Sequence, residues 1–142
     1  MSHCQCESRT DFGPKPYVTN VMRKAEENTD YRRALWTGCH VQMTIMCIPV
    51  GSDIGLEIHP DTDQIIRVER GMALVKMGAC ENRMESQTKI FVGDAVFVPA
   101  GTWHNVINIG RMPLKLSTVY APPHHSAGTV HHTRKDSEKA HY

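Results

Sequence analysis

The sequence predicts an all-β fold, either a sandwich or a barrel, and three observations support this. From residue 40 onward, short runs rich in Val, Ile, Met and Thr alternate with turns of Gly, Pro, Asn and Asp. The chain has 142 residues, which corresponds to one domain large enough to bury a substantial core. No segment of about 20–50 residues repeats, which excludes solenoids and propellers.

The N-terminal part of the chain has little strand character. Residues 1–18 contain the run Gly13-Pro14-Lys15-Pro16 and predict an irregular arm. Asn20 is a favourable helix N-cap followed by helix-forming residues, so we expect a short helix over Asn20–Asn28. Cys4 and Cys6 do not have the spacing of a zinc ribbon, and we expect no function for them because chain ends are usually poorly ordered.

Turn residues separate the segments that we expect to be strands. In chain order these are His40–Ile48, Leu56–His59, Gln64–Val68, Met72–Met77, Lys89–Val92, Ala95–Val98, Trp103–Asn108 and Leu114–Tyr120. After Pro122-Pro123 the chain is polar and rich in His, Lys and Asp. We therefore divide the chain into an arm with a short helix (residues 1–39), a β-barrel (40–120) and a His-rich polar tail (121–142).

Composition and charge exclude several classes of protein. The chain has 16 basic and 15 acidic side chains, so it lacks the basic surface that binding to nucleic acid or an anionic membrane requires. No apolar run approaches the about 20 residues that span a bilayer. The chain has five cysteines, and its N-terminus lacks the apolar stretch of a signal peptide. We therefore expect reduced thiols and a cytoplasmic location.

Two clusters of residues stand at fixed spacing. They are Gly51-x5-Glu57-x-His59-x4-Gln64-x6-Gly71 and Gly93-x5-Pro99-x-Gly101-x2-His104-x3-Asn108. The second set arises by chance with a probability on the order of 10⁻⁵ at average residue usage. Together the clusters resemble the two signature motifs of the cupin superfamily. The resemblance covers about residues 40–120 and implies a double-stranded β-helix (jelly-roll) barrel with a metal ion in its mouth.

The chain also resembles a subgroup of small single-domain cupins outside these motifs. The residues concerned are 28–33, Leu35–Gly38, Ala121–His125 and Gly128–His131. Some members of that subgroup carry mannose-6-phosphate isomerase labels, although its chemistry is generally unassigned. This second resemblance therefore bears more on fold than on function.

Four residues of the motifs are the predicted metal ligands: Glu57, His59, Gln64 and His104. Glu57 and His59 share one face of an extended segment because strand side chains alternate. Gln64 shares an apolar face with Ile66 and should point inward. Glu57 stands where the family usually has a His, and Gln64 where it usually has a Glu. Two imidazoles and one carboxylate suit one divalent ion, namely Fe, Mn, Ni or Zn.

Three functions remain open at this stage, and no catalytic or substrate-binding residue is assigned. A metal-dependent isomerase acting on a sugar or sugar phosphate is favoured, because phosphomannose isomerases, which are also cupins, use a similar set of Gln, Glu and two His. The alternatives are an Fe(II)-dependent dioxygenase and a non-catalytic module that binds a small ligand. We also expect a homodimer, from the family and from edge strands that need covering.

The histidines near the C-terminus form a separate group. They are His124, His125, His131 and His132. Exposed tails commonly have such a polar composition, so the favoured interpretation is a solvated or interface segment. In the alternative, His124 and His131 flank a bend at Ala127-Gly128 and fold over the mouth of the barrel.

Overall fold

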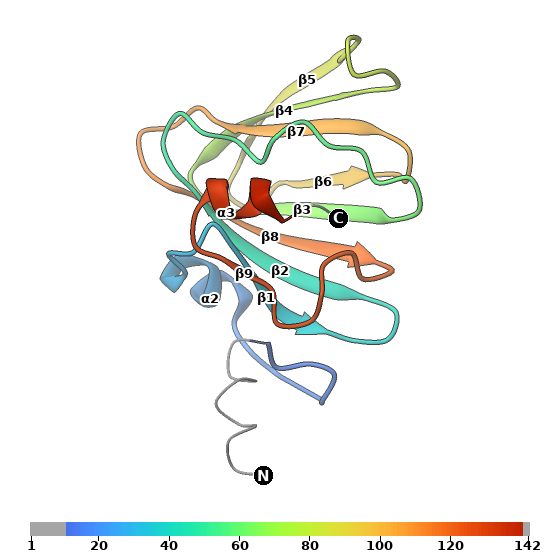
Figure 1. The fold of residues 1–142 in the computed structure, drawn as a ribbon. Coiled ribbons are helices and arrows are strands. Elements are labelled where there is room, and N and C mark those ends of the chain that lie inside the picture. The colour runs from blue at the N-terminus through green and yellow to red at the C-terminus, as the bar shows by residue number, and fades with distance from the viewer. Residues whose placement is uncertain (1–10, 141–142) are drawn as a thin grey trace.

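Two facing antiparallel sheets form the body of the protein in a computed structural model that describes residues 11–140 (Figure 1). The larger sheet has the strand order β6-β3-β8-β2-β1-β9, and the smaller has the order β5-β4-β7. Cys4 and Cys6 lie outside the described residues. The elements are α2 (Val21–Glu27), β1 (Arg32–Thr37), β2 (Gln42–Ile48), β3 (Asp63–Arg70), β4 (Met72–Gly78), β5 (Ser86–Phe91), β6 (Ala95–Val98), β7 (Trp103–Asn108), β8 (Leu114–Ala121), β9 (Val130–His131) and α3 (Arg134–Lys139).

The all-β prediction is confirmed. Along β3, side chains alternate between the core and solvent, and this alternation fixes which face of the strand points inward. In β3, Gln64, Ile66 and Val68 face inward, whereas Asp63 and Arg67 face solvent. Apolar side chains from both sheets meet in one core. The core includes Met46, Ile48, Ile66, Val68, Val75, Val106, Leu114 and Leu116. Burial of this apolar surface is the main stabilising contribution to such a fold.

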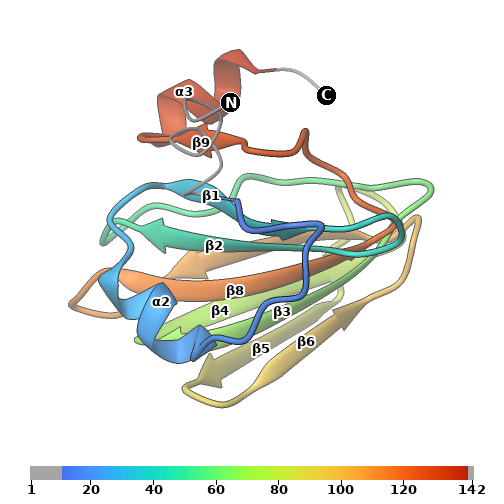
Figure 2. The same cartoon turned by 90° about the horizontal axis from the view of Figure 1, so that it is seen from below.

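The expected short helix is present as α2 and lies against the outside of the larger sheet (Figure 2). Asn20 caps it, because its side chain accepts a hydrogen bond from the Arg23 backbone N–H at 2.9 Å. Ala25 is fully buried and packs in a cluster with Leu35 and Ile45. The glycines of the two motifs occupy turns: Gly51, Gly71, Gly93 and Gly101 all have positive φ.

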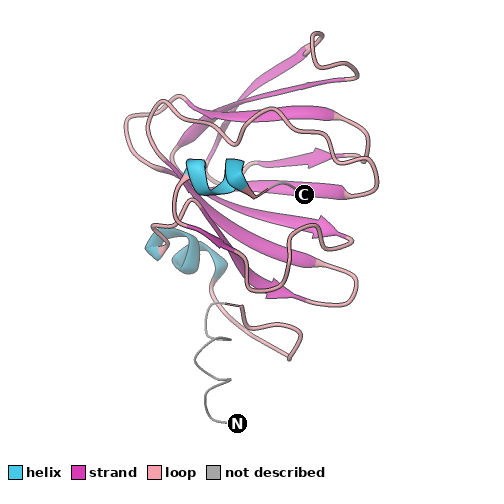
Figure 3. Cartoon of the chain, in the orientation of Figure 1, coloured by secondary structure: helices cyan, strands magenta, loops and turns pink. Residues whose placement is uncertain are grey.

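The structure corrects three expectations about secondary structure (Figure 3). Arg32–Thr37, which we assigned to the arm, is strand β1 and pairs with β2 along its length. Leu56–His59 does not form a strand. It belongs to a loop whose Glu57 makes an isolated bridge to His104. The polar segment after Pro123 contains β9, which pairs with β1, and α3.

The division of the chain at residues 40 and 121 remains a sequence-based prediction. Strands β1 and β9 lie outside residues 40–120, yet both pair within the larger sheet. Among the described residues, no helix combines the length and apolar character that crossing a membrane requires.

Candidate metal centre

Glu57, His59 and His104 come together in the mouth of the barrel, although they lie on different elements. His104 lies on β7, and Glu57 and His59 lie on the loop between β2 and β3. Two backbone hydrogen bonds join the loop to β7: the Glu57 N–H donates to the His104 carbonyl at 3.0 Å, and the His104 N–H donates to the Glu57 carbonyl at 2.9 Å. This pairing fixes the position of the carboxylate relative to the imidazole.

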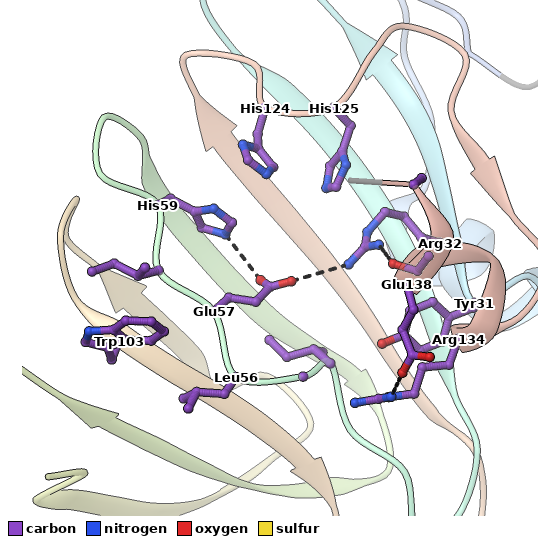
Figure 4. A pocket seen from close by; sticks show the side chains of 15 residues that line it. Tyr31, Arg32, Leu56, Glu57, His59, Trp103, His124, His125, Arg134 and Glu138 are labelled. Atoms are coloured by element: carbon purple, nitrogen blue, oxygen red, sulfur yellow. Dashed lines mark hydrogen bonds and ion pairs between the residues drawn. The ribbon is translucent and has the colours of Figure 1, made fainter. Parts of the chain in front are cut away.

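The carboxylate of Glu57 is the centre of the cluster (Figure 4). Its Oε1 lies 3.2 Å from His59 Nε2 and 3.7 Å from His104 Nε2. One ligand atom from each of the three residues lies within 4.8 Å of the other two. The two histidines are buried, and 27% of the Glu57 side chain is exposed to the pocket. Three such atoms could hold one metal ion.

The hydrogen bonding of His104 determines which nitrogen is available. Its Nδ1 lies 3.0 Å from the Thr102 carbonyl, which can only accept, so Nδ1 carries the proton. Nε2 then has a free lone pair in the neutral ring. This nitrogen is buried and has no hydrogen-bond partner among the described residues. Metal-binding histidines commonly donate from the other nitrogen to a carbonyl in this way.

Electrostatics favour the ionisation states that metal binding requires. Burial raises the pKa of Glu57, but the hydrogen bond from His59 and the charge of Arg32 outweigh it, so the net pKa lies below its usual value. Burial lowers the pKa of His104, which keeps the ring neutral. An ionised carboxylate and a neutral imidazole are the forms in which Glu57 and His104 would bind a metal ion.

Gln64, the fourth predicted ligand, lies on β3 and is 2% exposed. Its inward orientation agrees with the predicted alternation. Its Oε1 is buried and has no hydrogen-bond partner among the described residues. Buried carbonyl oxygens nearly always accept a hydrogen bond in folded proteins. Because this oxygen has no such partner among the described residues, it is able to accept one from a ligand or to bind a cation.

The segment after Pro123 forms one wall of a pocket beside the cluster, so the favoured interpretation, a solvated or interface segment, is wrong for His124 and His125, which line that pocket. The pocket has a volume of about 480 Å³, and its lining includes Glu57, His59, His124, His125, Arg134 and Ser137. The His124 ring lies 4.3 Å from the His59 ring, centroid to centroid. His125 and His131 are buried, whereas His132 is exposed and bonds to Asp30. The alternative, in which His124 and His131 fold over the barrel mouth, describes His124, whereas His131 lies against Arg32 and is not among the residues that line the pocket.

A buried glutamine positions His124 and His125. The Gln42 side chain, 0% exposed, accepts from the backbone N–H of His124 at 3.2 Å and of His125 at 2.9 Å. Its amide nitrogen donates to the His125 carbonyl at 2.8 Å. Sequence reasoning missed Gln42, because its partners lie about 80 residues away along the chain.

Sequence reasoning also missed Arg32. This residue was part of the subgroup resemblance but received no role. It lies on β1 and is 2% exposed, and its NH2 lies 4.0 Å from Oε2 of Glu57. An arginine buried to this extent in a strand is uncommon and could have attracted attention only once β1 had been recognised as a strand.

Comparisons with known proteins agree with this architecture. The family model described as "Cupin domain" matches residues 44–120. The uncharacterized protein YrkC of Bacillus subtilis is 52% identical over 130 residues, which are 92% of this chain and 70% of that protein. The uncharacterized protein L612 of Acanthamoeba polyphaga mimivirus is 38% identical over 85% of this chain and 74% of its own. The crystal structure of BH2720 from Bacillus halodurans has a TM-score of 0.91 and 52% identity, covering 92% of this chain and 99% of that one.

Proposed function

The chain belongs to the cupin family, and from that premise we propose that it is a metal-dependent enzyme acting on a small polar substrate. Glu57, His59 and His104 would hold one divalent metal ion in the barrel mouth. The observation that carries this proposal is the buried Nε2 of His104, which has no hydrogen-bond partner among the described residues and faces the Glu57 carboxylate at 3.7 Å. Two electron-rich groups in this arrangement favour a cation between them.

Gln64 is the proposed fourth ligand. Its support is the buried Oε1 without a partner among the described residues and the inward face of β3 on which it lies. An amide carbonyl is a neutral ligand that binds less strongly than a carboxylate. Gln64 would therefore contribute less to affinity than the other three residues, or would hold a water molecule or a substrate hydroxyl beside the ion.

An isomerase acting on a sugar or sugar phosphate is the favoured reaction. When bound, a divalent ion would supply Lewis acidity that polarises a carbonyl oxygen. Isomerisation also needs a base that moves a proton between neighbouring carbons. We assign this role to His124, which lines the pocket 4.3 Å from the His59 ring and is not among the proposed ligands. Burial lowers the pKa of His124, so its ring is neutral and can accept a proton.

An Fe(II)-dependent dioxygenase is the second candidate. The observation in its favour is the set of donors: two imidazoles and one carboxylate are the ligands of a common class of oxygen-activating iron enzymes. The same residues serve both proposals, so the identity of the metal ion separates them.

Metal content tests the shared part of the proposal. Protein purified without chelators should carry about one metal ion per chain by elemental analysis. The double variant His59→Ala/His104→Ala should carry almost none. Equal metal content in the two proteins would refute the site.

Two assays then separate the reactions. With Zn(II) or Mn(II), an isomerase exchanges solvent deuterium into the carbons next to the carbonyl of an aldose or ketose phosphate, which NMR detects. With Fe(II), a dioxygenase consumes oxygen in the presence of an oxidisable substrate, whereas the Zn(II) form does not. Deuterium exchange without oxygen uptake supports the isomerase, and the reverse result supports the dioxygenase.

Two further parts of the proposal concern the state of the protein. We propose that it forms a homodimer, supported by the exposed side chain of Phe97 on edge strand β6. We also propose a cytoplasmic location. It is supported by the cysteines of the described residues, Cys39, Cys47 and Cys80, all of which carry free thiols.

A further inference from the structure

The pocket beside Glu57 is also lined by Arg32, a charged side chain whose presence the metal ligands do not explain. Arg32 lies on the other side of Glu57 from His59 (Figure 4). Its NH1 donates to Ser137 Oγ at 2.6 Å and to His131 Nδ1 at 3.3 Å. Its Nε has no hydrogen-bond partner among the described residues. The hydrogen bonds of the buried Arg32 guanidinium therefore go to neutral groups, the Ser137 hydroxyl and the His131 ring.

Among the described residues, Arg32 has one nearby carboxylate, and it shares this group with the proposed metal site. Its NH2 is 4.0 Å from Oε2 of Glu57, which is longer than a hydrogen bond, and Oε1 of the same carboxylate faces the two histidines. The other arginine that lines the pocket differs in this respect. Arg134 contacts Asp53 at 2.8 Å and is also paired with Glu138. Its charge is therefore matched without any ligand.

The imidazoles around Arg32 are neutral, so Arg32 is the charged group of this cluster. Burial and, to a smaller extent, the charge of Arg32 lower the pKa of His125 to about 2, so this ring is neutral. His131 accepts a hydrogen bond from Arg32 and is likewise neutral, since burial lowers its pKa. With a divalent ion on the triad, the positive charges of the ion and Arg32 exceed the single negative charge of Glu57. Buried charge in excess favours binding of a counter-ion.

We propose that this pocket takes a small substrate with an anionic group, a carboxylate or a phosphate, and that Arg32 holds that group next to the metal ion. The inference rests on the proposed function, because the excess of positive charge requires metal at the triad. NH1 is occupied by Ser137 and His131. Nε has no hydrogen-bond partner among the described residues, and NH2 has a long contact of 4.0 Å with Met46 Sδ, so Nε and NH2 are the nitrogens left for the anion. The volume of about 480 Å³ suits a small molecule.

A purely structural role for Arg32 makes a different prediction. If the guanidinium serves only to orient Glu57, its removal should weaken metal binding, and anion binding should fall only in proportion to the metal that is lost. If it binds the anion, its removal should weaken anion binding at unchanged metal content. The two roles therefore separate when both quantities are measured on the same protein.

Calorimetric titration of the zinc-loaded full chain makes this comparison. The probes are sodium acetate and inorganic phosphate, with acetamide as the neutral control; the tighter of the two anions identifies the group. We expect Arg32→Gln to lower affinity for that anion at least tenfold while keeping its zinc. Arg33→Gln, on the same strand and paired with Asp30, should lower it less than threefold. An Arg32→Gln variant with wild-type anion affinity, or with lost zinc, would overturn the proposal.

A measurement on the wild-type protein covers the case in which the Arg32 variant does not fold. In protein labelled with ¹⁵N-arginine, the side-chain signals of Arg32 should shift as the anion is added. Absence of a shift at saturating anion, or absence of anion binding, would overturn the proposal. If the chain holds no zinc, the proposed function fails, and the same titration of the metal-free chain shows whether an anion site at Arg32 exists without it.

Discussion

His104 Nε2 lies 3.7 Å from Oε1 of Glu57, and this nitrogen is buried without a hydrogen-bond partner among the described residues. Because Nδ1 of the same ring donates to a backbone carbonyl, the lone pair of Nε2 is directed at the carboxylate side of the pocket. A structural histidine would normally use both nitrogens. The relationship therefore supports the proposal of His104 as a metal ligand more specifically than its burial does.

Removal of the ligands should lower zinc affinity in a graded order. We expect Glu57→Gln, His59→Ala and His104→Ala each to weaken zinc binding by about 100-fold or more, because even groups that only support a ligand contribute about 10–100-fold. Gln64→Ala should have a smaller effect, since it removes a neutral carbonyl. Competition with a chromophoric chelator measures these affinities.

His132→Ala is the matched control for this series. His132 is exposed and bonds to Asp30, away from the pocket. The zinc affinity of the His132→Ala variant should equal that of the wild type. A His104→Ala variant that binds zinc as tightly as the control would show that the triad is not the site.

Gln42→Leu should destabilise the protein and disturb the pocket together. The substitution leaves the backbone groups of His124 and His125 without their partners, at a cost of about 1–3 kcal/mol for a buried unsatisfied group. Urea denaturation measures the free energy of unfolding. Gln87→Leu, at an exposed position of β5, is the control and should change it by less than about 0.5 kcal/mol. Similar values for both variants would contradict the role assigned to Gln42.

The sequence was sufficient to predict the barrel and three residues, Glu57, His59 and His104, that the structure brings together. Fixed spacing within the second motif identified His104, and alternation along β3 placed Gln64 inside. Glu57 and His59 were predicted as neighbours on a strand, and they do share a site, although their segment is a loop. Here a single bridge to His104 replaces a full strand pairing. Local pattern was enough because each motif carries its own turn residues.

The second wall of the pocket could not be predicted, because it depends on contacts between distant parts of the chain. His-rich composition suggested a solvated or interface segment, but β9 pairs with β1 and brings His131 against Arg32. The helix α3 has no buried residue, so its sequence contains no apolar stripe that would predict docking. Polar contacts hold it instead, such as the pair of Arg134 with Asp53. Polar contacts between distant residues produce no periodic pattern in the local sequence, so the sequence alone does not predict them.

Phe97→Glu should convert the proposed dimer into a monomer. Phe97 lies on edge strand β6, is 68% exposed and pairs with Ile65, which is also exposed. Exposed apolar residues on an edge strand commonly mark an interface. Light scattering at micromolar concentration should give twice the chain mass for the wild type and for Lys89→Glu, a control on exposed β5, but one chain mass for Phe97→Glu. A monomeric wild type would contradict the dimer.

Stability of the metal-free protein should fall as the pH is lowered from 7 to 5, and His125 should contribute much of the decrease. Burial lowers the pKa of His125 to about 2, below its ordinary value near 6.5, so the unfolded chain binds a proton that the folded protein excludes. Stability is therefore lost progressively below pH 6.5, by about 1.4 kcal/mol per pH unit, which gives about 2 kcal/mol at pH 5. His104, His124 and His131, whose pKa values are also lowered, act in the same direction.

The variant His125→Gln tests this assignment, because a glutamine does not titrate. It should be less stable than the wild type at pH 7, where a buried ring and its contacts with Tyr120 are lost. Its free energy of unfolding should nevertheless change by about 2 kcal/mol less than that of the wild type between pH 7 and pH 5. Urea denaturation of chelator-treated protein at both pH values measures the difference. Parallel losses of stability in the two proteins would show that His125 is accessible to protons in the folded state, and that the segment after Pro123 opens readily from the barrel mouth.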